Sequence, residues 1–150
     1  MIIRIHLPKA EEIAARLGID KAGRAQAFHT NNIYRHLLPY MPMETGMFAT
    51  KQTTVSSPTT ITTLAPSAYY LYYGNRMVNA ATGKGPAYIP GVGYRWPRGA
   101  SLVATNEPLN YTKTFHPKAG PFWDQRMLAD DAAEIARELK DFIISQGDPK

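Results

Sequence analysis

The stretch GYRWPRGASL, residues 93–102, gathers the side chains best suited to recognise a ligand. It contains two arginines, a tyrosine and a tryptophan among glycine and proline. Arginine and aromatic side chains are frequent anchors of protein interfaces, and they also stack on the bases of single-stranded nucleic acids. A third use of such a stretch is as a lid over an active site. The residue types alone leave these three uses open.

The excess positive charge of the chain lies in the segment that contains this stretch. The whole chain carries a net charge of +5, and residues 74–120 hold six basic residues against one acidic residue, which is also a net +5. The remaining basic and acidic residues balance, at 11 each. The charged residues of the segment are Arg76, Lys84, Arg95, Arg98, Lys113 and Lys118 against Glu107. Any contact that depends on positive charge is therefore expected in this segment.

The run ATGKGP, residues 81–86, has the composition of a phosphate-binding loop but not its spacing. Lys84 is followed by Gly85 instead of serine or threonine, and the four-residue spacer after a first glycine is missing. Pro86 would interrupt the helix whose N-terminus must hold the phosphate. The longer run GKGPAYIPGVG does not follow a strand and open a helix, as a dinucleotide site requires. We therefore expect no nucleotide cofactor.

The titratable side chains do not form a catalytic or metal-binding pattern in the sequence, and the chain has no cysteine. His29 and His36 are seven residues apart, about 10 Å along a helix axis, which is too far for one metal ion. Asp130, Asp131 and Glu134 stand among basic residues at i,i+4 spacing and predict a solvated helix face. No G-x-S-x-G motif surrounds the serines and threonines. We expect no catalytic, cofactor or metal site, and a hydrolase would need a cluster that only the fold could assemble.

The helices and strands that must position these residues are expected to form one α+β domain, residues 1–150. We expect a mostly antiparallel sheet packed against a long C-terminal helix, with N-terminal helices and a long extended loop or hairpin. The predicted elements are a strand at 1–7, helices at 8–17 and 20–40, a hairpin at 51–56 and 59–64, and helices at 66–73 and 121–146. Asp20 is the predicted N-cap of the second helix, and Gly74 the end of the third. No apolar run approaches the roughly 20 residues of a membrane span, so we expect a soluble chain made in the cytosol, without membrane contact.

Residues 74–120 are unusual for a compact domain because they contain seven glycines, five prolines and no helical periodicity. Short strands are expected only at 101–104 and 111–115. The segment carries too many apolar residues to remain a free chain. We therefore expect it to be ordered against another surface.

The tyrosines of the run AYYLYY occupy every side of a two-turn helix. They are Tyr69, Tyr70, Tyr72 and Tyr73. One core cannot cover all sides of a helix, so at least one tyrosine faces outward or toward a partner. Core packing, a protein interface and base stacking all remain open for this set.

Two long runs of the sequence carry a family resemblance. They are APSAYYLYYGNRMVNAATGKGPAYIPGVGYRWPRG and TNEPLNYTKTFHPKAGPFWDQRMLADD. They resemble the minor capsid proteins of tailed siphophages and prophages of Gram-positive bacteria, relatives of the tail-completion, or head–tail joining, superfamily. In that family a tyrosine-rich helix ending in Tyr-Gly precedes a long extended segment, and a Pro-Phe-Trp motif then opens the C-terminal helix. Residues 72–74 and 121–123 match these two motifs, and 43–47 resemble the family's P-x-D-T-G-x-L element with Glu for Asp and Met for Leu.

The resemblance covers residues 42 to about 131 and implies a non-enzymatic component of the virion, assembled in the host cytoplasm. Members form homo-oligomeric rings, six- or twelve-fold, at the head–tail junction. Their partners are adjacent neck, portal, adaptor or tail-tube proteins, and genomic DNA passes through the channel with weak contact at most. The subunit-interface residues expected here are Tyr72, Tyr73, Arg76, Tyr88, Tyr94, Arg95, Trp96, Arg98, Phe122 and Trp123.

The alternative function is a basic nucleic-acid-binding module. Its stacking platform would consist of Tyr72, Tyr94 and Trp96 with Arg95 beside them. In the ring interpretation, the same basic residues pair with acids of a neighbour, such as Asp130 and Glu134, or face the DNA. Because a channel must let DNA slide, the ring interpretation favours protein contacts for most of them.

Overall fold

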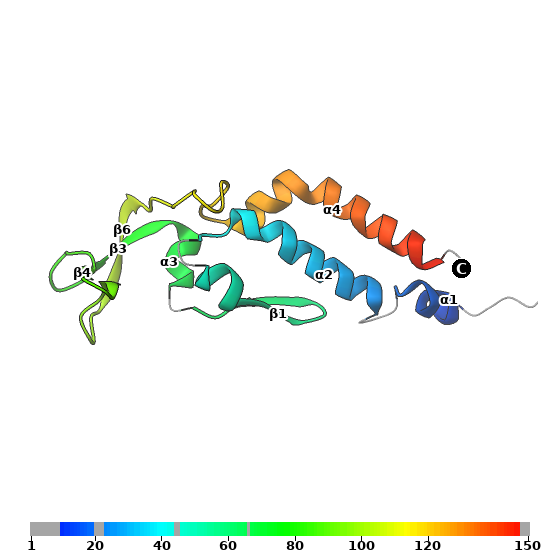
Figure 1. Ribbon diagram of the computed structural model, residues 1–150, viewed down its shortest axis with the longest axis horizontal. Coiled ribbons are helices and arrows are strands. Elements are labelled where there is room, and N and C mark those ends of the chain that lie inside the picture. Colours follow the sequence, from blue (N-terminus) through cyan, green and yellow to red (C-terminus); the bar gives the residue numbers. More distant parts are fainter. Residues whose placement is uncertain (1–9, 20–22, 44–45, 66, 148–150) are drawn as a thin grey trace, which may run out of the picture.

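The computed structural model describes residues 10–19, 23–43, 46–65 and 67–147 (Figure 1). The elements in chain order are α1 Ala10–Leu17, α2 Arg24–Leu37, the 3₁₀ turn η1 Leu38–Tyr40, the π-helical turn η2 Met47–Lys51, β1 Thr53–Ser57, β2 Thr60–Thr63, α3 Ala68–Tyr73, β3 Asn75–Asn79, β4 Ala87–Ile89, β5 Gly93–Arg95, β6 Leu102–Pro108 and α4 Trp123–Gly147. The molecule is elongated, with α1, α2 and α4 toward one end and β3 to β6 at the other (Figure 1).

The core lies where α2 and α4 run side by side over η1 and η2. Trp123, Met127 and Ile135 recur at helical spacing along α4, and they are 6%, 1% and 3% exposed. The edge of the Phe48 ring meets Trp123, with 5.6 Å between the ring centroids. The other buried members of this cluster are Leu37, Tyr40, Met41 and Ala49.

The β1–β2 hairpin is tied to α2 by side-chain hydrogen bonds. Tyr34 Oη donates to the carbonyl of Ala49 at 2.9 Å and to that of Thr53 at 3.1 Å. The hydroxyl of Thr53 is fully buried, and it bonds to the Phe48 carbonyl at 3.0 Å and to the Thr63 hydroxyl at 2.9 Å. Buried hydroxyls need such partners, so these bonds place the hairpin against the helix.

The strands β3 to β6 form what we call the arm, residues 75–108, and the other described residues form the body. Strand β3 pairs antiparallel with β6, Val78 opposite Val103, and β4 pairs antiparallel with β5. Residues 80–101, which join β3 to β6 and include β4 and β5, form the tip of the arm. Strand β3 contacts α3, and the amide of Leu109 donates to the Gly74 carbonyl at 2.7 Å where the chain re-enters the body.

The arm leaves the body at Gly74, which ends α3 in the left-handed conformation at φ 74°. A Cβ at this position would lie 2.9 Å from Pro121 Cβ and 3.1 Å from Tyr111 Oη. Glycine is therefore required here both by the backbone and by close packing. The predicted helix end is confirmed.

Residues 109–120 return along the body instead of continuing the arm. Tyr111 Oη donates to the Leu71 carbonyl at 2.5 Å, and His116 Nδ1 lies 2.8 Å from the Met41 carbonyl. The segment 74–120, which looked uniform in the sequence, thus consists of an arm and a strap on the body. No strand forms at 111–115, because these bonds direct the chain to the body, whereas β6 contains the strand expected at 101–104.

The α+β class, the antiparallel pairing and the long C-terminal helix are confirmed. The strands form three two-stranded sheets among the described residues, and α4 packs on α2 where we expected a sheet. The apolar stripe of α4 is matched by that of α2, so the two helices bury each other. Helix α2 begins at Arg24 with Gly23 at its N-cap. Asp20 and the strand predicted at 1–7 lie outside the described residues.

Within the described ranges, no helix is both long enough and apolar enough to cross a membrane.

Candidate interaction surface of the arm

The tip is built on the β4–β5 hairpin. Its turn is residues 90–92, where Gly91 has φ 76° and the amide of Val92 donates to the Ile89 carbonyl at 3.0 Å. Tyr88 lies opposite Tyr94 in the pairing, with ring centroids 5.3 Å apart. Opposed residues of an antiparallel pair share one face, so the hairpin presents both tyrosines on the same side.

The apolar side chains of the tip are exposed. Tyr88 and Tyr94 are 63% and 64% exposed, and Ile89 and Val92 are 44% and 52% exposed. Single exposed apolar residues are normal, but a group gathered on one small hairpin marks a surface for interaction. Strand pairing within the tip orders its backbone, and these side chains remain exposed.

The tip is also basic and contains no acidic residue. Lys84, Arg95 and Arg98 give residues 80–101 a net charge of +3, and none of the three forms an ion pair within the described part of the chain. The other arginine of the arm, Arg76, pairs with Glu107 at 2.6 Å. The surplus charge of the chain is therefore concentrated at the end of the arm.

The residues predicted as an interface fall into two groups in the structure. Tyr88, Tyr94, Arg95, Trp96 and Arg98 lie in the tip, Trp96 being half-buried, and Arg76 lies near the base of the arm. The other group, at the junction of α3 and α4, consists of Tyr72, Tyr73, Phe122 and Trp123.

The junction group packs mainly within the chain. Trp123 belongs to the core, and the Tyr72 ring meets Trp123 and Phe122 edge-on at 5.0 and 5.2 Å. Tyr72 Oη donates to Asp124 at 2.9 Å, and burial together with this bond raises the pKa of Tyr72. The stacking platform that combined Tyr72 with Tyr94 is therefore not formed, since the two side chains belong to the body and to the tip.

The tyrosine helix α3 does present an outward side. Tyr69 and Tyr73 are 64% and 46% exposed, with their rings 4.7 Å apart, whereas Tyr70 and Tyr72 are half-buried. The expectation that one core cannot cover all four rings is confirmed.

The ATGKGP run forms a turn between β3 and β4. The Asn79 side chain accepts the amide of Ala81 at 2.9 Å, and the Asn79 carbonyl accepts the amide of Gly83 at 2.7 Å. A strand follows this turn, so no helix N-terminus is available at this point to hold a phosphate.

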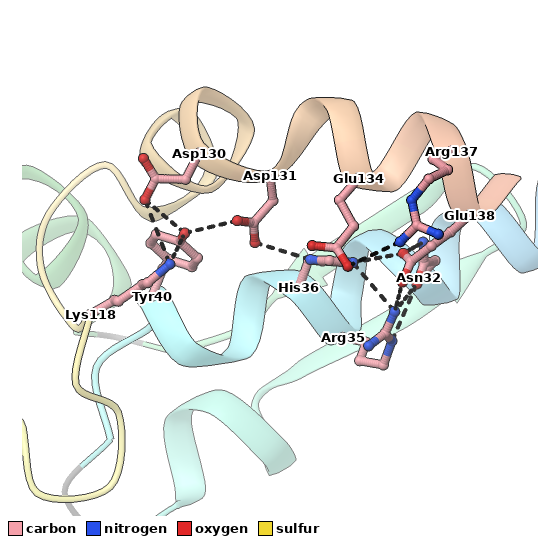
Figure 2. A network of polar contacts seen from close by, with 10 residues as sticks. All are labelled: Asn32, Arg35, His36, Tyr40, Lys118, Asp130, Asp131, Glu134, Arg137 and Glu138. Atoms are coloured by element: carbon pink, nitrogen blue, oxygen red, sulfur yellow. Dashed lines mark hydrogen bonds and ion pairs between the residues drawn. The ribbon is translucent and has the colours of Figure 1, made fainter.

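A polar network that the sequence analysis missed joins α2 to α4 (Figure 2). His36 Nδ1 lies 3.0 Å from Asp131 Oδ2, and His36 Nε2 lies 2.8 Å from Glu138 Oε2. Asn32 and Arg35 also donate to Glu138, at 2.6 and 2.8 Å. The His36 side chain is only 9% exposed and lies between the helices, whereas Arg35, 62% exposed, joins the network from the surface.

The network stabilises the charged forms of both His36 and Glu138. Burial by itself lowers the pKa of His36, but hydrogen bonds to Glu138 and Asp131 outweigh it, and the pKa is raised. Hydrogen bonds from Asn32 and His36 lower the pKa of Glu138 to about 2. Both imidazole nitrogens are engaged, so His36 has no free lone pair with which to act as a base. The network fastens α2 to α4.

Of the acids predicted on a solvated face, Asp130 and Glu134 are exposed as expected, with 56% and 55% of their side chains accessible, whereas Asp131 is only 20% exposed and lies against His36. Asp130 accepts from the buried Tyr40 hydroxyl at 2.8 Å, and Lys118 donates to that hydroxyl at 2.7 Å. Asp131 and Glu138 lie seven residues apart on the side of α4 that carries Met127 and Ile135. Acidic side chains within an apolar helix stripe need partners from another element. The seven-residue spacing of these two acids, in phase with the apolar stripe, is the feature of the sequence that could have predicted the network.

His29 does not join His36 in a common site. Its Nδ1 is buried without a hydrogen-bond partner among the described residues. In the same part of the chain, no group of three or more His, Asp or Glu side chains is arranged to hold a metal ion.

The tip of the arm thus combines exposed apolar side chains with basic side chains that form no ion pair among the described residues. Comparisons with protein-family models, with curated proteins and with solved structures find no match. A function must therefore be inferred from this surface and from the motifs of the sequence.

Proposed function

We propose that this chain is a structural subunit of the neck of a tailed phage. Its copies assemble into a ring at the head–tail junction, around the channel through which DNA passes. Adjacent portal-side and tail-side proteins bind above and below this ring. In this proposal the chain is not an enzyme, and it needs no cofactor, metal ion or membrane.

The observation that carries the proposal is the uncovered tip. Tyr88, Tyr94, Ile89 and Val92 are exposed at the end of an arm whose tip is remote from the body. Ordering such a segment costs conformational entropy, and burial against a neighbour offsets that cost. Tyrosine and arginine are the residue types that protein interfaces favour as anchors.

The arrangement of the sequence motifs also supports the proposal. The amide of Phe122 donates to the Tyr72 carbonyl at 2.9 Å, and Gly74 packs on Pro121. The Tyr-Tyr-Gly and Pro-Phe-Trp motifs, 47 residues apart in the sequence, therefore touch. Phe122 has φ 47°, which is unusual for a bulky residue, and its backbone closes this contact. Together the motifs determine where the arm leaves the body, as a subunit that reaches its neighbour requires.

A nucleic-acid-binding module is the second candidate. The net charge of +3 at the tip and the two exposed tyrosine side chains favour it, because single strands bind to basic surfaces on which bases can stack. It predicts DNA binding that weakens steeply as salt rises. Assembly through apolar contacts is instead expected to persist in salt.

The test is to measure the mass of the purified chain by light scattering at low and high salt, together with its affinity for single- and double-stranded DNA. The ring proposal predicts a salt-tolerant multi-subunit species with little DNA affinity, and its rotational symmetry is read from electron micrographs. A monomer that binds DNA tightly at low salt and releases it at high salt would refute the ring and support the nucleic-acid module.

A residue-level test uses Trp96→Ala with Arg95→Ala. We expect the double variant to fold but to lose most of the multi-subunit species. Leu64→Ser, which removes a side chain 77% exposed on the body, is the matched control and should assemble normally. Unchanged assembly of the double variant would show that this stretch is not an assembly contact.

A further inference from the structure

The base of the arm holds an uncharged pocket of about 310 Å³, lined by both apolar and polar side chains. Its apolar walls are Pro42, Met43, Phe48, Leu71, Leu109 and Tyr111. A water molecule takes about 30 Å³ in the liquid, so the pocket has room for side chains and not only for an ordered water. Its remaining lining residues are polar but uncharged. Such a pocket suits an uncharged occupant whose apolar side chains meet the apolar walls and whose backbone meets the polar ones.

Contacts already described hold two sides of the pocket. The strap residue Tyr111 closes one side through its hydrogen bond to the Leu71 carbonyl, and Phe48 belongs to the core. Leu109 follows directly on β6, so the pocket lies where the arm joins the body. Preformed walls of this kind reduce the entropy cost of binding.

The turn of the tip has the matching properties. Residues 89–93, IPGVG, contain no charged side chain, and Ile89 and Val92 project as exposed apolar groups from a tight turn. The basic residues Arg95 and Arg98 come after the turn, so they need not enter the pocket. The chain therefore contains an exposed apolar turn and an uncharged pocket with six apolar lining residues.

The turn cannot enter the pocket of its own chain. The hairpin of β4 and β5 lies at the far end of the arm, whereas α3, which lines the pocket, lies at the arm's base (Figure 1). The two surfaces are therefore available to different copies. A contact between two different surfaces of identical chains is heterologous and repeats head to tail until it closes as a ring.

We propose that the 89–93 turn of one copy inserts into the pocket at the arm base of a second copy. Ile89 and Val92 of the first copy contact Phe48, Leu71 and Leu109 of the second. Tyr88 and Tyr94 then lie near the rim, and Arg95 and Arg98 remain outside the pocket. This inference rests on the proposed self-assembly and identifies the surfaces that carry it.

The test combines two variants, each of which damages one surface. Ile89→Ser with Val92→Ser removes the turn's apolar groups and leaves the pocket intact. Ser67→Trp fills the pocket and leaves the turn intact. Ser67 is exposed, lines the pocket and makes no capping hydrogen bond to α3, so the fold should be retained.

Each variant alone is expected to be monomeric at concentrations about tenfold or more above those at which the wild type assembles. When mixed, they retain one type of intact contact, from the turn of the Ser67→Trp chain to the pocket of the other. The mixture should therefore form a one-to-one dimer and stop there. The matched controls are Val103→Ser, a 45% exposed side chain on β6, and Thr59→Trp on the β1–β2 turn, and both should assemble as the wild type does.

A crosslinking experiment measures the same contact without requiring stable assembly. The chain has no native cysteine, so Val92→Cys and Asn110→Cys in one chain supply the only two thiols. Asn110 is exposed and lines the pocket. A short bifunctional maleimide should give a ladder of dimers, trimers and larger species. Pairing Val92→Cys with Thr59→Cys serves as the control and should give no crosslinked ladder.

The outcomes separate this inference from the ring proposal. If the wild type forms rings but both variants still assemble and no ladder appears, the docking is wrong and the ring stands. If the mixture gives the one-to-one dimer while the wild type forms only a reciprocal dimer, the docking stands and the ring is wrong. Absence of wild-type assembly, of the mixed dimer and of the ladder overturns both. Loss of DNA binding in the turn variant with unchanged assembly would instead assign the tip to nucleic acid and overturn the docking.

Discussion

The body and the arm of this molecule differ in what covers their apolar side chains. In the body, Trp123 and Met127 are buried by side chains of the same chain. In the tip, Tyr88, Tyr94 and Val92 are more than half exposed. The arm is nevertheless ordered by strand pairing, which satisfies its backbone and not its side chains. The arm thus has an ordered backbone but exposed apolar side chains.

The same difference holds for charge. The body places its buried charges in pairs, with His36 between Asp131 and Glu138. The tip leaves Lys84, Arg95 and Arg98 without an acidic partner in the described part of the chain. Paired charge fastens the body internally, whereas in our proposal the unpaired charge at the tip orients an approaching partner.

The substitution expected to change the stability of the body most is Trp123→Ala. Removing a core aromatic should lower the free energy of unfolding by about 3–5 kcal/mol, because a cavity remains between α4 and Phe48. Chemical denaturation measures the change. A loss below about 1 kcal/mol would mean that the core of the body is not where the structure places it.

Gly74→Ala is expected to have the next largest effect, about 2–3 kcal/mol, because it forces φ 74° on an L-residue and brings Cβ to 2.9 Å from Pro121. Gly91→Ala is the matched control. It has the similar φ of 76° but nothing within 4 Å of the new Cβ, so it should cost about 1 kcal/mol. Equal losses in the two variants would contradict the close packing of Pro121 on Gly74.

The polar network predicts a pH dependence of stability that belongs to the body. The pKa of His36 is raised by folding, so its contribution is complete below pH 6.5 and is lost as the pH rises through the raised pKa. The pKa of Glu138 falls from 4.5 to about 2, so its contribution is present above pH 4.5 and is lost as the pH approaches 2. The two contributions are complete together between about pH 4.5 and 6.5.

His36→Asn should therefore lower the free energy of unfolding by about 1–2 kcal/mol near pH 6, and the difference from the wild type should shrink at higher pH. Denaturation curves across pH 4–9 provide the measurement. Arg137→Gln, which breaks only exposed pairs, should change stability by about 0.5 kcal/mol or less at every pH. A His36→Asn difference that grows as the pH rises would refute the assigned charges.

The smallest effect on stability is expected at the tip. Tyr88→Ser with Tyr94→Ser removes one cross-strand pair, which contributes about 1 kcal/mol or less. The body should unfold as in the wild type, while the multi-subunit species measured by light scattering should be lost. If the same variant destabilises the body and leaves assembly intact, the division between a self-contained body and an incomplete arm is wrong.

Local signals in the sequence predicted several elements correctly. The apolar period of residues 121–146 indicated α4, and the threonine-rich runs around Pro58 indicated the β1–β2 hairpin. Gly74 indicated the end of α3. Each of these elements depends on residues close to one another in the sequence, so the spacing and types of those residues were sufficient to predict it.

Contacts between distant residues were not predictable in this way. Asp131 was predicted to be a surface acid because its partner, His36, lies about a hundred residues earlier in the chain. Strand β3 was not predicted and β6 was predicted only near its start, because the two strands pair across a glycine-rich segment of more than twenty residues. Tyr72 and Trp123 are aromatic residues that suited an interface, but packing between α3 and α4 placed them inside the chain.

By itself the sequence determined the α+β class, the long C-terminal helix and the concentration of positive charge between residues 74 and 120. These properties follow from composition and local periodicity. Only the tertiary structure decided which part of that segment projects and which part packs on the body. The physical reason is that the apolar stripes of α2 and α4 bury each other, and that residues 109–120 form hydrogen bonds to the body. In the tip, strand pairing satisfies the backbone hydrogen bonds, while the apolar and basic side chains remain available to a partner.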